Sequence, residues 1–368
     1  MDLGESGDFA GATAVSTNIA VRNPSIASVA VKFPPHRYTQ TAAIRALTDV
    51  AGPDFQRLAR DSAVDLRDTA MRPPRYRGLR GCTAADDAYL EVALELGEQA
   101  LRAALEEAKV KPSELDIVFS TPVAGLAAPT LDARLATRVG LRPDLKRVPL
   151  FGLDSVAAAA GVARMHDYLR AFPDQTAALL AVELCSLTVQ RQDTSVASAV
   201  ATSLFGDGAA AVITEGAHRT GREHTGPRVL ATRSRSYPDT EEVTSWKIGG
   251  DGFRVVLSAD VCTIAQKYLG DDVREFLADH GLAPRDVTTW VCHPGGPRVI
   301  ENVESVLKLP PGALDHTRKS LRENGNLSSL SLFDVLAANM ADPPAPGAIG
   351  LMIAMGPAFC SELVLLAW

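Results

Sequence analysis

The stretch FGLDSVAAAAGVARMHDYL, residues 151–169, joins the end of a predicted strand to a helix rich in small residues. Gly152 marks a tight turn, and Ser155 stands at the junction with Asp154 beside it. A side chain at the start of a helix lies near free backbone N–H groups and the positive end of the helix dipole. The junction therefore predicts a nucleophile at Ser155. The alternative is that Asp154 or Ser155 only caps the helix, which contributes about 1 kcal/mol.

Short apolar runs alternate with helical patterns on both sides of this junction. The predicted strands cover residues 26–33, 115–121, 147–152, 177–185, 206–214, 287–296 with a terminal turn, 348–355 and 361–368. The predicted helices, besides the one after Ser155, cover residues 89–108, 129–140, 259–281 and 328–340. Alternation of this kind is typical of an α/β fold with buried strands.

A polar stretch, EGAHRTGREHTGP at residues 215–227, is predicted to link two parts of similar make-up. These parts are an N-terminal half, residues 25–214, which carries Ser155, and a C-terminal half, residues 228–368. Residues 1–24 are polar and rich in Gly, Ser and Thr, which predicts a flexible tail. We expect the active site where the two halves meet.

The bulk composition excludes several classes of function. The chain has 368 residues, a net charge of −7 and a hydrophobic content of 46%, which argues against a nucleic-acid partner. No apolar run approaches the ~18 residues of a membrane span, and the N-terminus lacks a secretory pattern. The five cysteines are scattered without a CxxC pair, which predicts reduced thiols in a cytoplasmic protein and no metal site.

Two more residues are candidates for chemistry. His293 ends an apolar strand before Pro-Gly-Gly, a position that faces a cleft in many α/β folds, and imidazole transfers protons near neutral pH. Asn326 precedes a helix and can donate an amide N–H to a developing oxyanion. The alternatives are a structural histidine held by nearby backbone and ordinary turn chemistry at Asn326.

Six ordered motifs carry a family resemblance, namely FGLDSVAAAAG, VELCSLTVQ, LFGDGAAAVI, WVCHPGG, ENGNLSS and AMGPAFCSELVLLAW. From about residue 25 onward the chain resembles type III polyketide synthases of the bacterial, chalcone-synthase-like branch. The resemblance implies a thiolase fold, with two similar halves in a five-layered α-β-α-β-α arrangement, and a homodimer with its subunit contact near residues 120–140. It also implies acyl-CoA starters extended with malonyl-CoA to pyrone or resorcinol-type products, without an acyl carrier protein, a cofactor or a metal.

The resemblance also implies roles for single residues. The family uses a Cys-His-Asn triad, and His293 and Asn326 match its last two members. The positions that match its gating phenylalanines, cavity lining and cavity-shaping loop are Phe205 and Phe253, Thr188 and Ser328, and Gly356 and Pro357.

Asp154 and Ser155 depart from the family, which has Gly-Cys at these positions. A cysteine ionises readily at a helix start, whereas a serine needs a general base, and Asp154 adds a negative charge that opposes an oxyanion. Three explanations stay open. They are an engineered Cys-to-Ser variant of a normal synthase, an acyl-serine acyltransferase or acyl-CoA hydrolase without chain extension, and a non-catalytic acyl-CoA-binding homologue.

Overall fold

The computed structural model describes residues 23–47, 54–76, 78–79, 81–122, 124–189, 193–219, 226–249, 252–258 and 260–368. The first 22 residues of the predicted tail lie outside this set, as do residues 220–225 of the predicted linker. Asn23 and Pro24 are buried, and the Pro24 carbonyl accepts a hydrogen bond from the Val229 N–H at 2.9 Å. The last two residues of the predicted tail are therefore part of the packed fold.

Nine strands form one mixed sheet in the order β11-β12-β13-β8-β1-β7-β6-β4-β5. The N-terminal group is β1 (Ser25–Lys32), β4 (Ile117–Pro122), β5 (Lys146–Pro149), β6 (Thr176–Leu184) and β7 (Asp207–Glu215). The C-terminal group is β8 (Arg228–Ser236), β11 (Val287–Cys292), β12 (Ile349–Gly356) and β13 (Cys360–Ala367). Only the Ser25–Arg228 pair joins β1 to β8 in the recorded register, so the sheet consists of two strand groups connected at one end.

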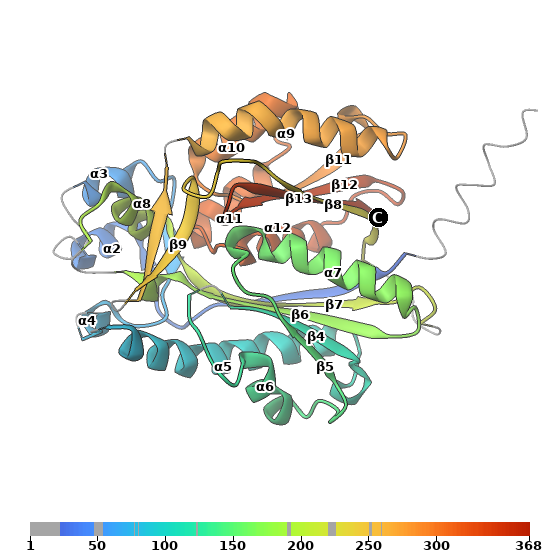
Figure 1. The fold of residues 1–368 in the computed structure, drawn as a ribbon, viewed down its shortest axis with the longest axis horizontal. Coiled ribbons are helices and arrows are strands. Elements are labelled where there is room, and N and C mark those ends of the chain that lie inside the picture. Colours follow the sequence, from blue (N-terminus) through green and yellow to red (C-terminus); the bar gives the residue numbers. More distant parts are fainter. Residues whose placement is uncertain are drawn as a thin grey trace, which may run out of the picture.

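Helices cover both strand groups and fill the space between them, which produces five layers (Figure 1). The outer layers are α5 (Gly81–Glu107) with α6 (Leu131–Val139) on one side, and α9 (Val261–Ala278) with α10 (Pro297–Leu307) on the other. The central layer is α7 (Ala157–Ala171) with α12 (Leu330–Ala341), and α11 (Asp315–Asn324) packs beside α12. The predicted five-layered α-β-α-β-α arrangement is confirmed.

The strands are apolar on both faces because each face packs against helices. In β6 all nine residues are buried. Leu179 joins the core around α7 and α12, whereas Leu180 joins the core under α5 and α6. Successive side chains of a strand point to opposite faces, so a continuous apolar run is what a strand between two helical layers requires.

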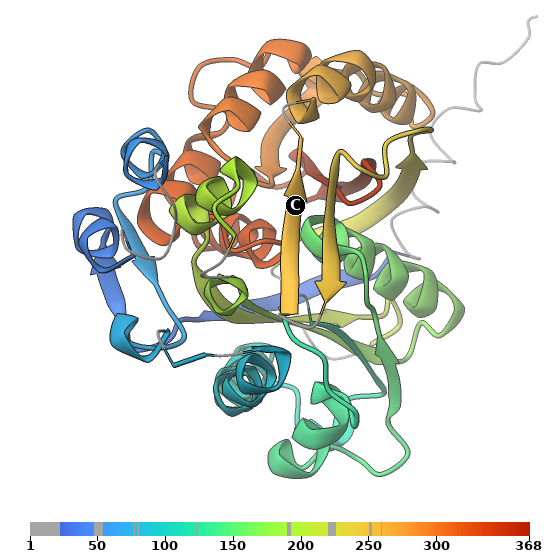
Figure 2. The same ribbon diagram turned by 60° about the vertical axis from the view of Figure 1, so that its left-hand side comes forward.

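Shorter elements gather at one end of the layers, on the left in Figure 1. They are β2 (Arg37–Thr39), β3 (Leu66–Asp68), β9 (Thr244–Gly249), β10 (Gly252–Leu257), α2 (Gln40–Leu47), α3 (Phe55–Arg60), α4 (Pro73–Tyr76) and α8 (Val196–Leu204). Four 3₁₀ helices complete the described structure, at Pro112–Glu114, Asp154–Val156, Cys185–Thr188 and Pro284–Asp286. Figure 2 shows the β9–β10 hairpin standing across this end of the molecule.

Several predicted boundaries are wrong by a few residues. The strand predicted over residues 147–152 ends at Pro149, although the Leu150 N–H still donates to the Ser120 carbonyl at 2.8 Å. The helix predicted from residue 89 begins at Gly81, because residues 81–88 carry too few large apolar side chains to show a stripe. The helix predicted from residue 328 begins at Leu330, whereas the strand predicted within residues 287–296 ends at Cys292, before its predicted turn.

Candidate active site

The strand-to-helix junction is a tight turn followed by one turn of 3₁₀ helix, Asp154–Val156, which leads into α7. Gly152 has a φ of +82° and Asp154 a φ of +44°. A positive φ is uncommon for a residue with a Cβ atom, although Asp tolerates it better than most. Ser155 therefore stands on a constrained turn, half-buried, directly before the central helix.

The small residues after Ser155 let α7 pack closely between the two strand groups. Ala157, Ala158 and Ala159 are almost fully buried. A Cβ atom added at Gly161 would lie 2.5 Å from Leu179 Cδ2 in β6, so only glycine fits there without a shift of that side chain. On the other side, a Cβ atom on Gly356 would lie 3.0 Å from Val156 Cγ1. Gly356 thus brings the end of β12 against the junction.

The Asp154 carboxyl is held by groups from three elements. Ser328 Oγ donates a hydrogen bond to Asp154 Oδ1 at 2.8 Å. The nearby indole of Trp246 and the backbone N–H of Ser155 also favour the ionised carboxyl, although the indole nitrogen makes no hydrogen bond of good geometry. Desolvation by the surrounding protein outweighs these donors and raises the pKa of Asp154 above its ordinary value.

Ser328 links Asp154 to the other two predicted residues. Its backbone N–H donates to Asn326 Oδ1 at 2.8 Å, and Asn326 Nδ2 donates to the Gly295 carbonyl at 3.4 Å. His293, which follows β11, is 8% exposed and its backbone N–H donates to the Ile353 carbonyl. Burial lowers the pKa of His293 to about 4, against a hydrogen bond with the Ser328 backbone that raises it. The imidazole is therefore neutral at pH 7.

Hydrogen bonds thus connect the surroundings of Ser155, His293 and Asn326 through Ser328, which has a φ of +52°. No measured contact joins the Ser155 hydroxyl to either of the other two side chains, so their convergence into a triad stays a prediction. A neutral His293 is suited to donate or accept one hydrogen bond, but it does not supply a positive charge that would stabilise an ionised nucleophile.

An aromatic cluster surrounds the predicted gate. The rings of Phe205 and Trp246 stack with their centroids 6.1 Å apart, and Trp246 meets Phe253 edge-on at 6.3 Å. Both predicted gating phenylalanines therefore pack near one indole, and that indole contributes to the pKa shift of Asp154. The sequence analysis missed Trp246. The chain has only three tryptophans. The one in the stretch SWKIGG is therefore the signal that could have identified Trp246.

The sequence analysis also missed a second carboxyl, that of Glu183. It is fully buried at the end of β6 and accepts a hydrogen bond from Ser329 Oγ. Burial raises the pKa of Glu183 well above its usual range, and the charge of Asp154 adds to the rise. Two carboxyls that resist ionisation, those of Asp154 and Glu183, therefore lie near the junction.

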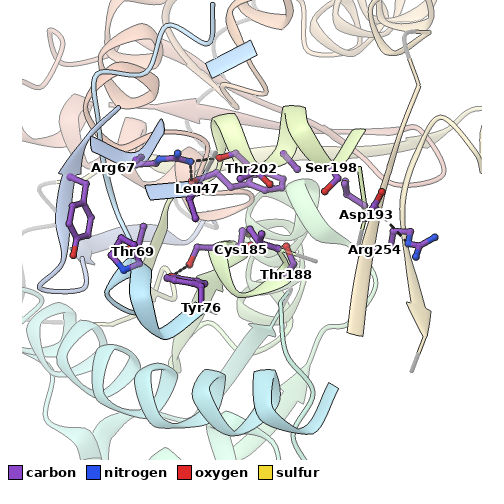
Figure 3. Close-up of a pocket in the computed structure, with 18 residues that line it drawn as sticks. Leu47, Arg67, Thr69, Tyr76, Cys185, Thr188, Asp193, Ser198, Thr202 and Arg254 are labelled. Carbon is purple, nitrogen blue, oxygen red and sulfur yellow. Dashed lines mark hydrogen bonds and ion pairs between the residues drawn. The ribbon is translucent and has the colours of Figure 1, made fainter. Parts of the chain in front are cut away.

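A pocket lies at the end of the molecule that holds the shorter elements (Figure 3). Two predicted cavity residues, Phe205 and Thr188, line it, together with Cys185. Phe205 also pairs with Asn326 in a parallel bridge, which places the pocket next to the hydrogen-bonded cluster around Ser328. The other predicted site residues do not line this pocket, namely Ser155, His293, Asn326, Phe253, Ser328, Gly356 and Pro357.

The described thiols near the site are protonated at neutral pH. Burial raises the pKa of Cys185 well above its ordinary value, with contributions from the charges of Glu183 and Asp207. Burial also raises the pKa of Cys360 to about 11, and its Sγ donates to the Pro357 carbonyl at 3.4 Å. Neither residue therefore offers a thiolate in place of the cysteine that the resemblance leads one to expect at position 155.

In the part of the chain that the structure describes, no group of three or more His, Cys, Asp or Glu side chains is placed to hold a metal ion. No helix within the described ranges is both long and apolar enough to cross a membrane.

Comparison with known proteins identifies related chains across nearly the whole sequence. Two family models match, one for the N-terminal domain of chalcone and stilbene synthases over residues 79–218, and one for the C-terminal domain over residues 229–367. The 1,3,6,8-tetrahydroxynaphthalene synthase of Streptomyces peucetius subsp. caesius is 48% identical over 354 residues, covering 94% of both chains. A putative chalcone synthase of Bacillus subtilis is 32% identical over 289 residues, covering 76% of this chain and 79% of that protein.

A solved structure agrees with these matches. The 1,3,6,8-tetrahydroxynaphthalene synthase of Streptomyces coelicolor A3(2), described as a bacterial type III polyketide synthase, superimposes with a TM-score of 0.88 at 26% identity. The match covers 94% of this chain and 99% of that one.

Proposed function

The chain belongs to the chalcone and stilbene synthase family, and on this premise we propose that it is a type III polyketide synthase. It loads an acyl-CoA starter, extends it by decarboxylative condensation with malonyl-CoA and cyclises the product to a pyrone or resorcinol-type compound. The observation that carries the proposal is the pocket, which adjoins the linked His293, Asn326 and Ser328 through the Phe205–Asn326 bridge. Because a 48% identical relative is a tetrahydroxynaphthalene synthase, polyhydroxylated naphthalenes are the first products to seek.

In this proposal Ser155, His293 and Asn326 form the catalytic set, and Ser155 occupies the place of the family cysteine. Phe205 and Phe253 gate the cavity, Thr188 and Ser328 line it, and Gly356 with Pro357 shapes it. Support comes from the hydrogen bonds through Ser328, the aromatic cluster around Trp246 and the packing of Gly356 on Val156. The substrates are CoA thioesters, and the reaction needs no further cofactor and no metal. We place the two halves at residues 25–214 and 228–368, and the enzyme in the cytoplasm, where CoA thioesters are made.

One observation favours a second candidate function. The pKa of Asp154 is raised beside a residue that cannot form a thiolate, and the nearby thiols of Cys185 and Cys360 are protonated. A serine ester is a poorer acyl donor for a carbanion than a thioester. The site as it stands therefore suits other functions better than condensation. These are an acyl-serine acyltransferase, an acyl-CoA hydrolase and an acyl-CoA-binding homologue.

The function assay separates these candidates in one experiment. The protein is incubated with a panel of aromatic and long-chain acyl-CoA starters plus malonyl-CoA, and with malonyl-CoA alone, and products are identified by mass spectrometry. We expect pyrones, resorcinols or hydroxylated naphthalenes. Free acid with released CoA would support the hydrolase, and bound acyl-CoA without turnover would support the binding homologue. The same assay on Ser155→Ala shows whether any product depends on the hydroxyl group.

The edge of the sheet supports a homodimer. β5 is the last strand, paired only with β4 in the recorded sheet, and an unpaired edge attracts another chain. Large apolar side chains are exposed close by, with Phe151 at 52% and Leu126 at 41%. We expect a homodimer that buries about 2,000 Å² or more in total. Light scattering at micromolar concentration should give twice the chain mass, and a monomer would contradict the expectation.

A further inference from the structure

A chain of hydrogen bonds runs from the pocket wall into the protein interior. Tyr76 lines the pocket (Figure 3), and its hydroxyl lies 2.5 Å from Ser186 Oγ. Ser186 Oγ in turn donates to Asp207 Oδ2. The three residues come from α4, from the 3₁₀ helix after β6 and from the start of β7, so the fold brings them together across long stretches of sequence. None of the three was a predicted site residue.

The direction of these hydrogen bonds follows from counting hydrogens. A serine hydroxyl has one hydrogen, and Ser186 gives its hydrogen to Asp207. Ser186 Oγ must therefore accept from the Tyr76 hydroxyl. The Tyr76 oxygen meanwhile accepts from the Met71 N–H at 3.3 Å. The Thr69 hydroxyl also lies beside this oxygen, but it gives its one hydrogen to the Met71 carbonyl at 2.9 Å. One lone pair of the phenol is therefore left for a ligand in the pocket.

Asp207 is placed to receive a proton. Its side chain is fully buried, yet it accepts hydrogen bonds from the Ser186 hydroxyl, the Ser186 N–H at 2.8 Å and the Ala70 N–H at 2.5 Å. Burial raises the pKa of Asp207 to about 6, and these donors with the buried Arg67 guanidinium hold it from rising further. The carboxylate is thus largely ionised at pH 7 and still basic enough to take up a proton.

We propose that Tyr76 is a catalytic acid–base residue of the pocket, and that Ser186 and Asp207 are positioning residues that relay its proton. The proposal rests on the proposed function, and its substrate is the β-keto chain that a polyketide synthase builds. A methylene flanked by two carbonyls gives up a proton to the Tyr76 oxygen. The Tyr76 proton moves to Ser186 Oγ, and the Ser186 proton moves to Asp207 Oδ2. The C–H electron pair remains on the substrate as an enolate, and the reverse sequence returns a proton to a carbon or oxygen of the chain.

This step is what cyclisation of a poly-β-ketone requires, because ring closure begins with an enolate and ends with protonation of an oxygen. The pocket is suited to such a chain, since the apolar Leu47 and Val255 share its wall with the hydroxyls of Thr69 and Thr188. Tyr76 is partly buried, and a base that is shielded from bulk water acts on the bound chain rather than on solvent.

The test measures proton exchange without requiring condensation. The full chain is mixed with acetoacetyl-CoA in deuterated buffer, and loss of the C2 hydrogens is followed by NMR above the rate in buffer. We expect Tyr76→Phe to lower the turnover number of this exchange about a hundredfold with little change in KM. Ser186→Ala should act in the same direction, and Ser186→Thr, which keeps a hydroxyl, should restore most of the rate.

Controls separate a relay from a structural role. Tyr268→Phe removes a phenol that lies outside this pocket and stacks on Tyr237, and it should change the exchange rate by less than about threefold. Acetoacetyl-CoA binding and thermal unfolding are measured for each variant. If Tyr76→Phe does not fold, the comparison of Ser186→Ala with Ser186→Thr tests the relay in its place. Exchange at the wild-type rate in Tyr76→Phe, or none in the unchanged protein, overturns the proposal. Catalysed exchange without polyketide products would instead contradict the proposed function alone.

Discussion

Changing Ser155 to Cys and Asp154 to Gly together is expected to raise the rate of polyketide formation about a thousandfold, equivalent to roughly 4 kcal/mol of barrier. The cysteine supplies a nucleophile that ionises near neutral pH, and it carries the acyl group as a thioester that a carbanion attacks readily. Because His293 is neutral at pH 7, the serine gains no stabilisation as an alkoxide from an imidazolium. The change at position 155 is therefore the larger of the two.

The change at Asp154 is expected to add to the first. Asp154 has a φ of +44°, a conformation that glycine adopts without strain. Removing its carboxyl also removes a group that, whenever it ionises, would raise the pKa of the neighbouring cysteine. The two residues are neighbours, so their effects need not sum. Ser328 Oγ loses its acceptor in the process, and the interactions of the carboxyl with the Trp246 indole and the Ser155 backbone are lost with it.

Single and paired variants separate the contributions. Ser155→Cys alone is expected to be active but slower than the pair. Ser155→Cys with Asp154→Asn removes the charge and keeps the backbone strain, so its difference from the glycine pair measures the strain. Products are quantified by mass spectrometry over a broad acyl-CoA panel. A folded, dimeric double variant that makes no pyrone, resorcinol or naphthalene would contradict a synthase cavity, and Ser155 would then be an acyl-serine nucleophile or a helix cap.

Replacing His293 with Gln is expected to remove a pH dependence of stability worth about 3 kcal/mol. Burial lowers the pKa of His293 from 6.5 to about 4. Between these two values the unfolded chain binds a proton at this residue and the folded chain does not, so the free energy of unfolding falls as the pH falls. The loss is about 1.4 kcal/mol per pH unit. It begins as the pH drops through 6.5 and is complete near pH 4.

Urea unfolding at pH 7.5 and pH 4.5 measures this effect. Between these values the unchanged protein should lose about 2 to 3 kcal/mol more than His293→Gln. The raised pKa of Asp207 acts in the opposite sense, but it is present in both proteins and cancels in the comparison. His218→Gln, at an exposed histidine, should keep the wild-type pH dependence. Equal pH slopes for the His293 variant and the unchanged protein would show that His293 is not buried neutral in solution.

Much of the layered fold was readable from local patterns. The apolar run in β6 and the alanine-rich start of α7 indicate a strand and a helix that are buried on every side, because only such elements tolerate apolar residues at all positions. Several of the elements that escaped prediction are very short. α4 has four residues and β2 has three, too few to show a period of 3.6 or 2.

Site residues divide in the same way. Ser155 and His293 stand at the ends of regular elements, where a sequence pattern marks the boundary. No local pattern identifies Trp246, Glu183 or the Tyr76–Ser186–Asp207 relay. Their roles depend on contacts with side chains that are distant in sequence. Tyr76 and Ser186 are 110 residues apart, and no local pattern records that their hydroxyls touch.

The sequence alone determined the class of fold, the family and the position of the junction at Ser155. These depend on periodicity, turn residues and ordered motifs, all of which are visible in the linear sequence. Only the tertiary structure decided that His293 is neutral, that Asp154 is held by Ser328, and that Asp207 is ionisable yet buried. Protonation depends on desolvation and on the charges and donors nearby. Those quantities exist only after distant segments have packed together.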